Sequence, residues 1–387
     1  MDRISRTDLV KTFQNNFKEK FHEKNFITSS APGRINLIGE HTDYNNGYAM
    51  PFGIDRWICT VISKRTDNKI ILFSHNYDLE IKTNIDFDLN FQETWKKYIF
   101  GCIKLFIEKH PAETGYNILI GGNIPIGYGL SSSAALEVSL LGALYKISNI
   151  EIDMEILNTA KKVENEIIKI NSGFLDQYAS LESKKNKILF IDFKTKTHKL
   201  FNFQLENASL LLIKSSSNRL LAESGYNKRV KECSDGLKII NSKLLNNIEN
   251  HELNLDHLNL LEENMTLQKR LKHLIRENMR VKAMINALND NNINLVGELL
   301  YESHKSLSMD YEVSTNEIDS IINISKSLKG FLGGRIIGGG FGGCCLVLIE
   351  NEFKKSFKST LIEIFSKKYR HELSIESFKS CSGLVIN

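Results

Sequence analysis

A short polar segment near the start of the sequence is the first candidate for chemistry. Residues 31–51 read APGRINLIGEHTDYNNGYAMP, and five polar or charged side chains fall there within eleven positions, namely Arg34, Glu40, His41, Asp43 and Tyr44. Because every hydroxyl of a sugar both donates and accepts hydrogen bonds, so dense a set of hydrogen-bonding side chains beside glycine suits a sugar. An ordinary charged loop would carry the same residue types, so this segment alone leaves both interpretations open.

A second segment has the features of an anion site. Residues 121–135 (GGNIPIGYGLSSSAA) join a strand-like run to a helical run. Free backbone N–H groups at a helix start, together with the positive end of the helix dipole, attract phosphate. Ser131, Ser132 and Ser133 could donate to phosphate or bind a hard cation such as Mg²⁺. The segment lacks the G-K-[ST] of a P-loop and the third glycine of a dinucleotide-binding loop. The alternative is a serine that only caps the helix.

An isolated carboxylate marks a third segment. Asp176 lies in NSGFLDQYAS, residues 171–180, three positions after Gly173 and among apolar side chains. An unpaired carboxylate would be costly in such surroundings. The residue either caps a helix that begins near Gln177 or is held in a site by a cation, and the local sequence does not decide between them.

Glycine is concentrated in these segments and in one more. Seventeen of the 24 glycines are Gly53, just after the first segment, and those that fall in the three segments above and in residues 330–343, which hold eight of them. Because glycine permits positive φ and has no Cβ, such clusters mark places where the backbone must approach something closely. We expect residues 333–343 (GGRIIGGGFGG) to form a second close-approach loop ahead of a strand.

The elements that position these segments mix helix and strand. Hydrophobic periodicity predicts an amphipathic helix at the start of the sequence and mostly helical structure over 227–330. The pattern further predicts strands at 56–63, 69–73 and 116–120, helices from the serines onward and at 151–170, a β pair at 187–193 and 209–214, then a strand at 344–349, a helix at 352–369 and an extended piece at 382–387.

Composition excludes several classes of protein. A formal net charge of +4, from 50 basic and 46 acidic residues, excludes a dedicated nucleic-acid binder, and the basic stretch 269–282 is expected to be the solvated side of a helix. Six cysteines without a C-x-x-C pair, and no signal peptide or apolar run of about 18 residues, favour a cytoplasmic protein without membrane contact.

The length of 387 residues predicts two domains, which we place at 1–205 and 206–387. We expect the protein to be a monomer.

Six ordered motifs together resemble the GHMP kinases and, within them, the galactokinase family. GRINLIGEHTDYNNGYAMP resembles the galactokinase signature, IPIGYGLSSSAALEVS the superfamily's phosphate loop and GGRIIGGGFGGC its third motif, while VENEIIKINSGFLDQYAS, SGYNKRVKEC and ESHKSLSMDYEVSTNEID are also galactokinase-like. The resemblance covers nearly the whole sequence. It implies an α+β fold of two domains, the first similar to ribosomal protein S5 domain 2 and the second ferredoxin-like, with the active site in the cleft between them.

The resemblance implies ATP-dependent phosphorylation of the anomeric hydroxyl of α-D-galactose, and a role for each matching residue. Asp176 matches the catalytic aspartate, and Arg34 matches the arginine that contacts it and the transferring phosphoryl group. The sugar contacts correspond to Arg34, Glu40, His41, Asp43, Gly173, Asp176 and Tyr226. Contacts to the nucleotide correspond to Gly127, Gly129, Ser131, Ser132 and Ser133, with Trp95 near the adenine, and the Mg²⁺ ligands to Ser133 and Glu164.

One departure from the family pattern is visible. The family commonly has Pro-Cys-Gly and Met where this sequence has Asn171-Ser172-Gly173 and Leu175. Because Gly173 and Asp176 keep their spacing, we expect the difference to affect sugar specificity rather than catalysis. Two alternatives remain: a kinase for a related sugar such as N-acetylgalactosamine, and a catalytically silent sensor of galactose and ATP. The intact serine run disfavours the sensor.

Overall fold

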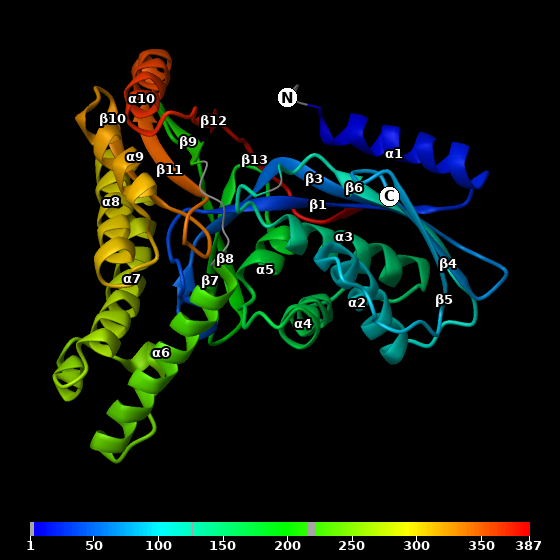
Figure 1. Cartoon of the computed structure of the whole chain (residues 1–387), viewed down its shortest axis with the longest axis horizontal. Helices are drawn as coiled ribbons and strands as arrows, with labels where there is room; N and C mark the ends of the chain where they lie inside the picture. Colours follow the sequence, from blue (N-terminus) through cyan, green and yellow to red (C-terminus); the bar gives the residue numbers. More distant parts are fainter. Residues whose placement is uncertain (1–3, 126, 216–221) are drawn as a thin grey trace.

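The computed structural model describes residues 4–125, 127–215 and 222–387. Its first sheet has the strand order β14-β1-β3-β6-β4-β5, with β13 paired to β3 beside this path (Figure 1). Every neighbouring pair is antiparallel except β4 with β6. The strands are β1 (Ile27–Asn36), β3 (Pro51–Lys64), β4 (Lys69–Ser74), β5 (Leu79–Asn84), β6 (Tyr116–Gly122), β13 (Ser380–Cys381) and β14 (Val385–Ile386).

Helices cover both faces of this sheet. Successive side chains of a strand point to opposite faces, and in β3 Trp57 and Cys59 pack against α1 (Arg6–Phe21), whereas Ile58 and Ile62 belong to the core on the other face. That second face is covered by α2 (Thr94–Lys109), α3 (Ser132–Ile147) and α5 (Leu175–Glu182). Figure 1 shows α1 on one side of the sheet and α2 and α3 on the other. The largely apolar stretch of β3 from Trp57 to Ile62 is therefore needed because both faces of the strand are buried there.

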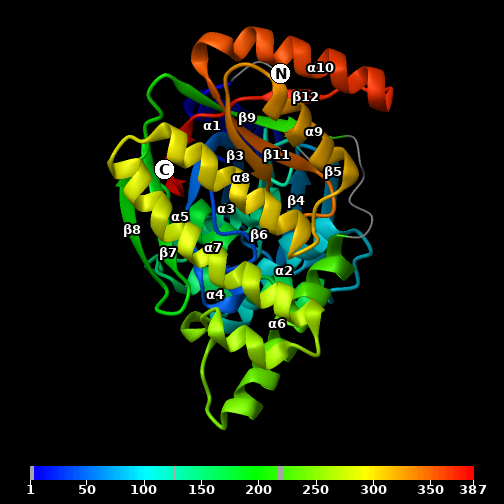
Figure 2. The ribbon, with the colours of Figure 1, turned by 90° about the vertical axis from the view of Figure 1, so that its left-hand side faces the viewer.

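A second sheet, in the order β10-β11-β9-β12, lies beside a layer of helices (Figure 2). Its strands are β9 (Ala208–Lys214), β10 (Phe331–Ile336), β11 (Cys344–Glu350) and β12 (Ser374–Glu376), and the helices are α6 (Ala222–Leu244), α7 (Met265–Asn289), α8 (Ile293–Met309), α9 (Asn316–Ser327) and α10 (Lys354–Tyr369). Helix α8 packs closely on β10 because two glycines meet there: a Cβ on Gly333 would lie 1.9 Å from the carbonyl oxygen of Gly297.

The remaining elements are short. A small third sheet joins β2 (Tyr48–Ala49), β7 (Lys187–Asp192) and β8 (Thr197–Asn202). The short helices are η1 (Asp43–Asn45), α4 (Glu155–Lys162), the π-helix η2 (Val163–Ile168), η3 (Asn250–Glu252), η4 (Asp256–Leu261) and η5 (Asn351–Phe353). Within the described residues no helix is long and apolar enough to cross a membrane.

Most predicted elements are confirmed, with two corrections. The strands near 187–193 and 209–214 exist but do not pair with each other: β7 pairs with β8 and β2, and β9 pairs with β11 and β12. The expected loop at 333–343 begins later, because residues 333–336 belong to β10, where glycine serves the contact with α8. The division at 205/206 stays a prediction, and β13 and β14 return to the first sheet.

Candidate active site

Arg34, on strand β1, contacts Asp176 and the backbone of Gly129 and Leu130. Its Nε and Nη2 atoms lie 2.8 and 2.6 Å from Oδ1 of Asp176, and its Nη1 donates to the carbonyl oxygen of Gly129 at 2.7 Å. Its backbone N–H donates to the carbonyl oxygen of Leu130 at 3.0 Å. The preceding residue, Gly33, must lack a side chain, because a Cβ there would lie 2.6 Å from that same oxygen of Leu130.

Asp176 lies in the first turn of α5 and does not cap it. The N-cap residue is Phe174, and no side chain makes a capping hydrogen bond there. One carboxylate oxygen of Asp176 is held by Arg34, and the other accepts a hydrogen bond from the hydroxyl of Ser131. Of the two interpretations left open by the sequence, a carboxylate held by a cation is the one observed. About a third of the side chain stays exposed, so the group is accessible to a ligand.

The segment 127–133 turns sharply into helix α3. Gly127 and Gly129 have φ of 81° and 68°, and Ser131, the N-cap residue, has φ of 56°. The Ser131 side chain makes no capping hydrogen bond, so the capping interpretation is wrong for this serine, and its hydroxyl serves Asp176 instead. A cavity of roughly 220 Å³ lies over this turn. It is lined by Arg34, Pro125, Gly127, Gly129, Leu130, Ser131, Ser132, Ser133, Asp176, Gly338 and Gly339.

Glu40 is held by groups from both sheets. Its Oε2 accepts a hydrogen bond from Nδ2 of Asn36 at 2.8 Å. Its Oε1 accepts one from the backbone N–H of Gly338 at 2.7 Å and lies 3.3 Å from Nη2 of Arg335. Arg335 is fully buried, so its charge needs this carboxylate as a partner. The glycine-rich loop after β10 thus completes a site that begins on β1.

His41 is a neutral imidazole in an aromatic cluster. Burial, with smaller contributions from His273 and Arg229, lowers the pKa of His41 to about 3. Its Nδ1 lies 2.8 Å from the hydroxyl of Tyr44, and its ring centroid lies 5.4 Å from that of Tyr226. Among the described residues its buried Nε2 has no hydrogen-bond partner. An unpaired buried nitrogen in a cavity wall is available to a polar ligand.

Asp43 and Gly173 lie against each other on the wall of the same cavity. A Cβ on Gly173 would lie 2.2 Å from Oδ2 of Asp43, so only glycine fits at 173. Burial, followed by the like charges of Asp176 and Glu40, raises the pKa of Asp43 to about 7. The cavity that these residues border has a volume of roughly 200 Å³. A space of this size lined by carboxylates, an imidazole and a phenol fits a small polyhydroxylated molecule.

A buried carboxylate and a serine lie near Asp176. Burial raises the pKa of Glu164, on the π-helix η2, to about 7, and the hydroxyl of Ser172 donates to this carboxylate. Glu164 and Ser133 both border the cavity of Asp43 and Gly173. Within the described residues no three His, Cys, Asp or Glu side chains form a preformed metal site. A cation bound here would therefore need further ligands from a substrate or water.

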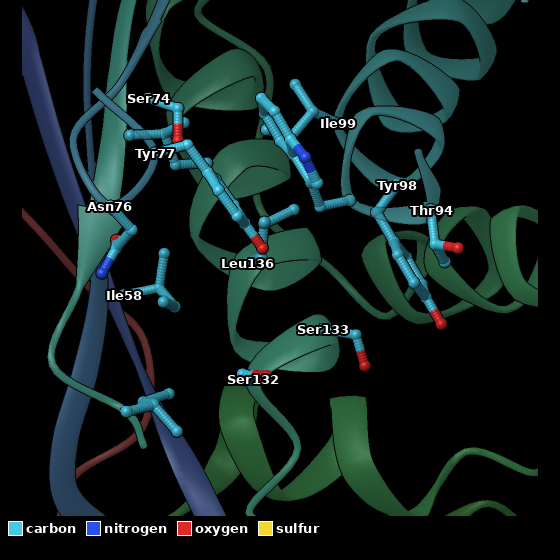
Figure 3. A pocket seen from close by; sticks show the side chains of 14 residues that line it. Ile58, Ser74, Asn76, Tyr77, Thr94, Tyr98, Ile99, Ser132, Ser133 and Leu136 are labelled. Carbon is cyan, nitrogen blue, oxygen red and sulfur yellow. The ribbon is translucent and has the colours of Figure 1, made fainter. Parts of the chain in front are cut away.

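A third cavity, of roughly 340 Å³, is largely apolar and opens beside the serines (Figure 3). The rings of Tyr77 and Trp95 stack in its wall, with centroids 4.5 Å apart and planes at 14°. Figure 3 shows Tyr77 and Ile99 toward one end of the view and Ser132 and Ser133 toward the other. Flat aromatic walls of this kind suit a planar ring.

The three cavities adjoin one another through shared residues. Arg34, Asp176 and Ser133 border both the cavity of Asp43 and the one over the 127–133 turn, and Ser132 and Ser133 border both the latter and the apolar cavity. All the candidate residues from the sequence except Tyr44 lie on one of these three walls, and the Tyr44 hydroxyl contacts Nδ1 of His41 instead.

Comparison with known proteins agrees with this arrangement. A model described as the galactokinase galactose-binding signature matches residues 15–64, and models of the N-terminal and C-terminal domains of GHMP kinases match residues 97–184 and 281–359. Galactokinase from Staphylococcus carnosus is 35% identical over 376 residues, covering 95% of this chain and 96% of the relative. Galactokinase from Thermosipho africanus is 37% identical over 92% of this chain and 98% of the relative.

The chain belongs to the galactokinase family of the GHMP kinases.

Solved structures extend the family assignment to the fold. The structure of Lactococcus lactis galactokinase complexed with galactose superposes with a TM-score of 0.89 at 31% identity, covering 97% of this chain and 99% of that one. Mevalonate kinase from Methanococcus jannaschii, at 21% identity and a TM-score of 0.63, shares the fold. The two-domain α+β GHMP kinase fold expected from the sequence is thereby confirmed.

Sequence reasoning missed several residues of this galactokinase-family site. Arg335 and Gly338, which hold Glu40, were hidden in a glycine cluster expected to be one loop. Glu137 on α3 is fully buried, its pKa is raised well above the ordinary range by burial, and Nε2 of Gln177 donates to it at 3.0 Å. Its place inside the apolar stripe of α3 was the available signal, since an acidic residue in such a stripe needs a partner.

Proposed function

We propose that the protein transfers the γ-phosphoryl group of ATP to the anomeric hydroxyl of α-D-galactose, giving galactose 1-phosphate and ADP. The observation that carries this proposal is the Asp176 carboxylate, bound by Arg34 and Ser131 on the boundary shared by two cavities. A group at such a boundary can contact an acceptor in one cavity and a phosphoryl donor in the other. The curated galactokinases and the galactose complex of a relative support galactose as the acceptor.

Asp176 is the proposed general base. Phosphoryl transfer requires positioning and charge neutralisation more than covalent chemistry from the protein. In the proposed reaction the bond between the γ-phosphorus and its bridging oxygen breaks as a bond forms from sugar O1 to phosphorus. The proton of O1 passes to the Asp176 carboxylate, which also orients O1 electrostatically. Arg34, beside both Asp176 and the 127–133 turn, neutralises negative charge on the transferring group.

The sugar and the nucleotide would occupy different cavities. Glu40, His41, Asp43 and Tyr226 would bind the sugar hydroxyls, because these side chains present acceptors and donors to one small cavity. The backbone of the 127–133 turn and the start of α3 would bind the phosphates. The stacked pair of Tyr77 and Trp95 would receive the adenine in the apolar cavity.

The donor set near Asp176 fits Mg²⁺. Magnesium prefers oxygen ligands and is commonly held by one or two carboxylates together with substrate phosphates and water. Glu164 and Ser133 offer a carboxylate and a hydroxyl on the wall of one cavity, and burial raises the pKa of Glu164 to about 7. When bound, Mg²⁺ would neutralise the phosphate oxygens. Glu164 and Ser133 would hold the ion against the phosphates.

Three finer expectations also belong to this proposal: a domain division at 205/206, a cytoplasmic location and a monomer. Five of the six cysteines are buried and none is paired in the structure described, as suits a reducing compartment. Light scattering after size-exclusion chromatography would measure the mass in solution, and a dimer mass would contradict the monomer.

Sugar-dependent ADP production tests the function directly. The purified protein with Mg²⁺ and ATP should release ADP with galactose and much less with glucose, its C4 epimer. N-acetylgalactosamine in the same assay tests the related-sugar alternative. Sugar binding without any ADP release would instead identify a catalytically silent sensor.

A further inference from the structure

The cavity over the 127–133 turn is short of positive charge for the ligand proposed there. The only cationic side chain on its described wall is Arg34, and this guanidinium is already paired with Asp176 at 2.6 Å. Glu164 and Asp43 add two more carboxyl groups nearby. A nucleoside triphosphate keeps a net negative charge even with the proposed Mg²⁺ bound, and backbone N–H groups and a helix dipole offer only partial charges. A second ammonium or guanidinium group would offset this imbalance.

Lys214 reaches the turn from the other sheet. It is the last residue of β9, paired with Cys344 of β11 and Ser374 of β12. Its Nζ lies 4.4 Å from the ring centroid of Tyr128, within the range of a cation–π contact. The hydroxyl of Tyr128 donates to Ser374 Oγ at 2.8 Å, so the turn and the second sheet are joined at two points.

Gly127 places this ammonium at the edge of the cavity. Among the described residues other than its chain neighbours, the one heavy atom within 4 Å of a Cβ on Gly127 would be the Nζ of Lys214, at 3.7 Å. Gly127 itself is exposed and lines the cavity. Within the described part of the chain Lys214 forms no ion pair, so its charge is not already neutralised by a carboxylate. The side chain is half-buried, which limits its conformational freedom before a ligand binds.

We propose that Lys214 binds the phosphates of the nucleotide, supplying from the second sheet the cation that the 127–133 turn lacks. This inference rests on the proposed use of ATP. A purely structural role would be the competing account: Lys214 would hold Tyr128 by its cation–π contact and so tie the turn to β9, without contacting phosphate.

The two accounts predict different losses of affinity for ADP and adenosine when Lys214 is replaced. ADP and adenosine share the base and ribose but differ in phosphate. Replacement of Lys214 by methionine keeps an unbranched side chain and removes the charge. We expect K214M to weaken ADP binding roughly ten- to a hundredfold, the range for a hydrogen bond to a charged group, while adenosine binding stays within about twofold. K214R should retain most of the ADP affinity because it retains the charge.

The control and the ionic-strength dependence sharpen this test. Lys326 makes a similar contact, with Nζ 4.6 Å from the Tyr301 ring, on helices α9 and α8 outside the three cavities. K326M should bind ADP as the unaltered protein does. The affinity for ADP should fall less steeply with added salt in K214M than in the unaltered protein, because one screened charge is gone.

Calorimetric titration with ADP and with adenosine decides the outcome. Unchanged ADP affinity in K214M, or an equal loss for ADP and adenosine, would overturn the role of Lys214. Failure of the unaltered protein to bind ADP would instead refute the proposed use of ATP. The two failures are therefore distinguishable in the same set of titrations.

Discussion

The carboxylate of Glu277 on α7 accepts a hydrogen bond from the backbone N–H of Glu40, at 3.3 Å. The same oxygen accepts one from the N–H of Gly39 at 3.0 Å, and the other carboxylate oxygen is paired with Arg280. Glu277 is fully buried, and its charged neighbours, Arg280 first, hold the pKa of this carboxyl low, at about 2, against the effect of burial. The backbone that carries Glu40 and His41 is thus bound by a helix more than 200 positions away in sequence.

Removal of this carboxylate should strongly destabilise the protein. Glu277→Ala leaves two buried N–H groups without an acceptor and Arg280 without its partner, for which we expect a loss of about 3–5 kcal/mol. Urea denaturation measures the change. The double variant E277A/R280M should recover part of the loss, because it removes the uncompensated charge. A loss below about 1 kcal/mol in E277A would contradict the assigned role.

Asp176→Asn should abolish turnover and leave sugar binding within a few-fold. The amide keeps the shape of the carboxylate but cannot accept the O1 proton, and a catalytic group of this kind typically contributes about 10²–10⁴-fold. ADP release measures turnover, and calorimetry measures sugar binding. Ser131→Ala removes the hydrogen bond to Asp176 but keeps the carboxylate, and it should reduce turnover less. Near-normal turnover in D176N would refute the assignment.

Gly173→Ala should impair the sugar site selectively. The new methyl group would lie 2.2 Å from Oδ2 of Asp43, so either Asp43 or the turn before α5 must move. We expect sugar affinity to fall at least roughly tenfold, which corresponds to about 1.4 kcal/mol, with little change for ADP. Gly339→Ala is a matched control on the same cavity, since its Cβ would lie 3.3 Å from the Tyr226 ring and needs a smaller adjustment. Equal effects of the two substitutions would contradict the prediction.

Asp43 should make the stability of the ligand-free protein depend on pH. Its pKa is raised from 3.8 to about 7, so the folded protein retains this proton over a range in which the unfolded chain has lost it. The contribution of Asp43 to stability therefore falls as pH rises from about 4 to 7 and is constant above that range. Asp176 and Glu40 repel its negative charge, and Lys161 attracts it.

Asp43→Asn removes this dependence. We expect its melting temperature, relative to that of the unaltered protein, to be higher at pH 8 than at pH 5 by at least about 2 °C. Differential scanning calorimetry at the two pH values measures the difference. Asp78→Asn, at a turn residue outside the three cavities, is the control. A difference that is the same at both pH values would show that Asp43 is ionised normally.

Local sequence was enough to predict the helices and strands and the residues that line the site. It was not enough to predict which strands pair or which side chains bind one another. The serine-rich turn was predicted because a strand, glycines and a helix start are contiguous in sequence. The hydrogen bond from Ser131 to Asp176 was not predicted, because Asp176 lies 45 residues further along the chain. The pairing of strands 187–193 and 209–214 was predicted wrongly for a related reason: nearness in sequence favoured it, whereas each strand has an apolar face that belongs to a different core.

The contacts of Glu40 also indicate that activity requires both parts of the chain. Its acceptor atoms are satisfied by Asn36, the last residue of β1, and by Arg335 and Gly338 from the region after α9. A fragment that ended between the two sheets would keep the signature segment, yet the Glu40 carboxylate, which we propose binds the sugar, would lose its fixed orientation. Neither fragment would phosphorylate a sugar by itself, and turnover in a mixture of the two would report their reassembly. The segment that resembles the galactokinase signature is therefore expected to act only in the assembled molecule.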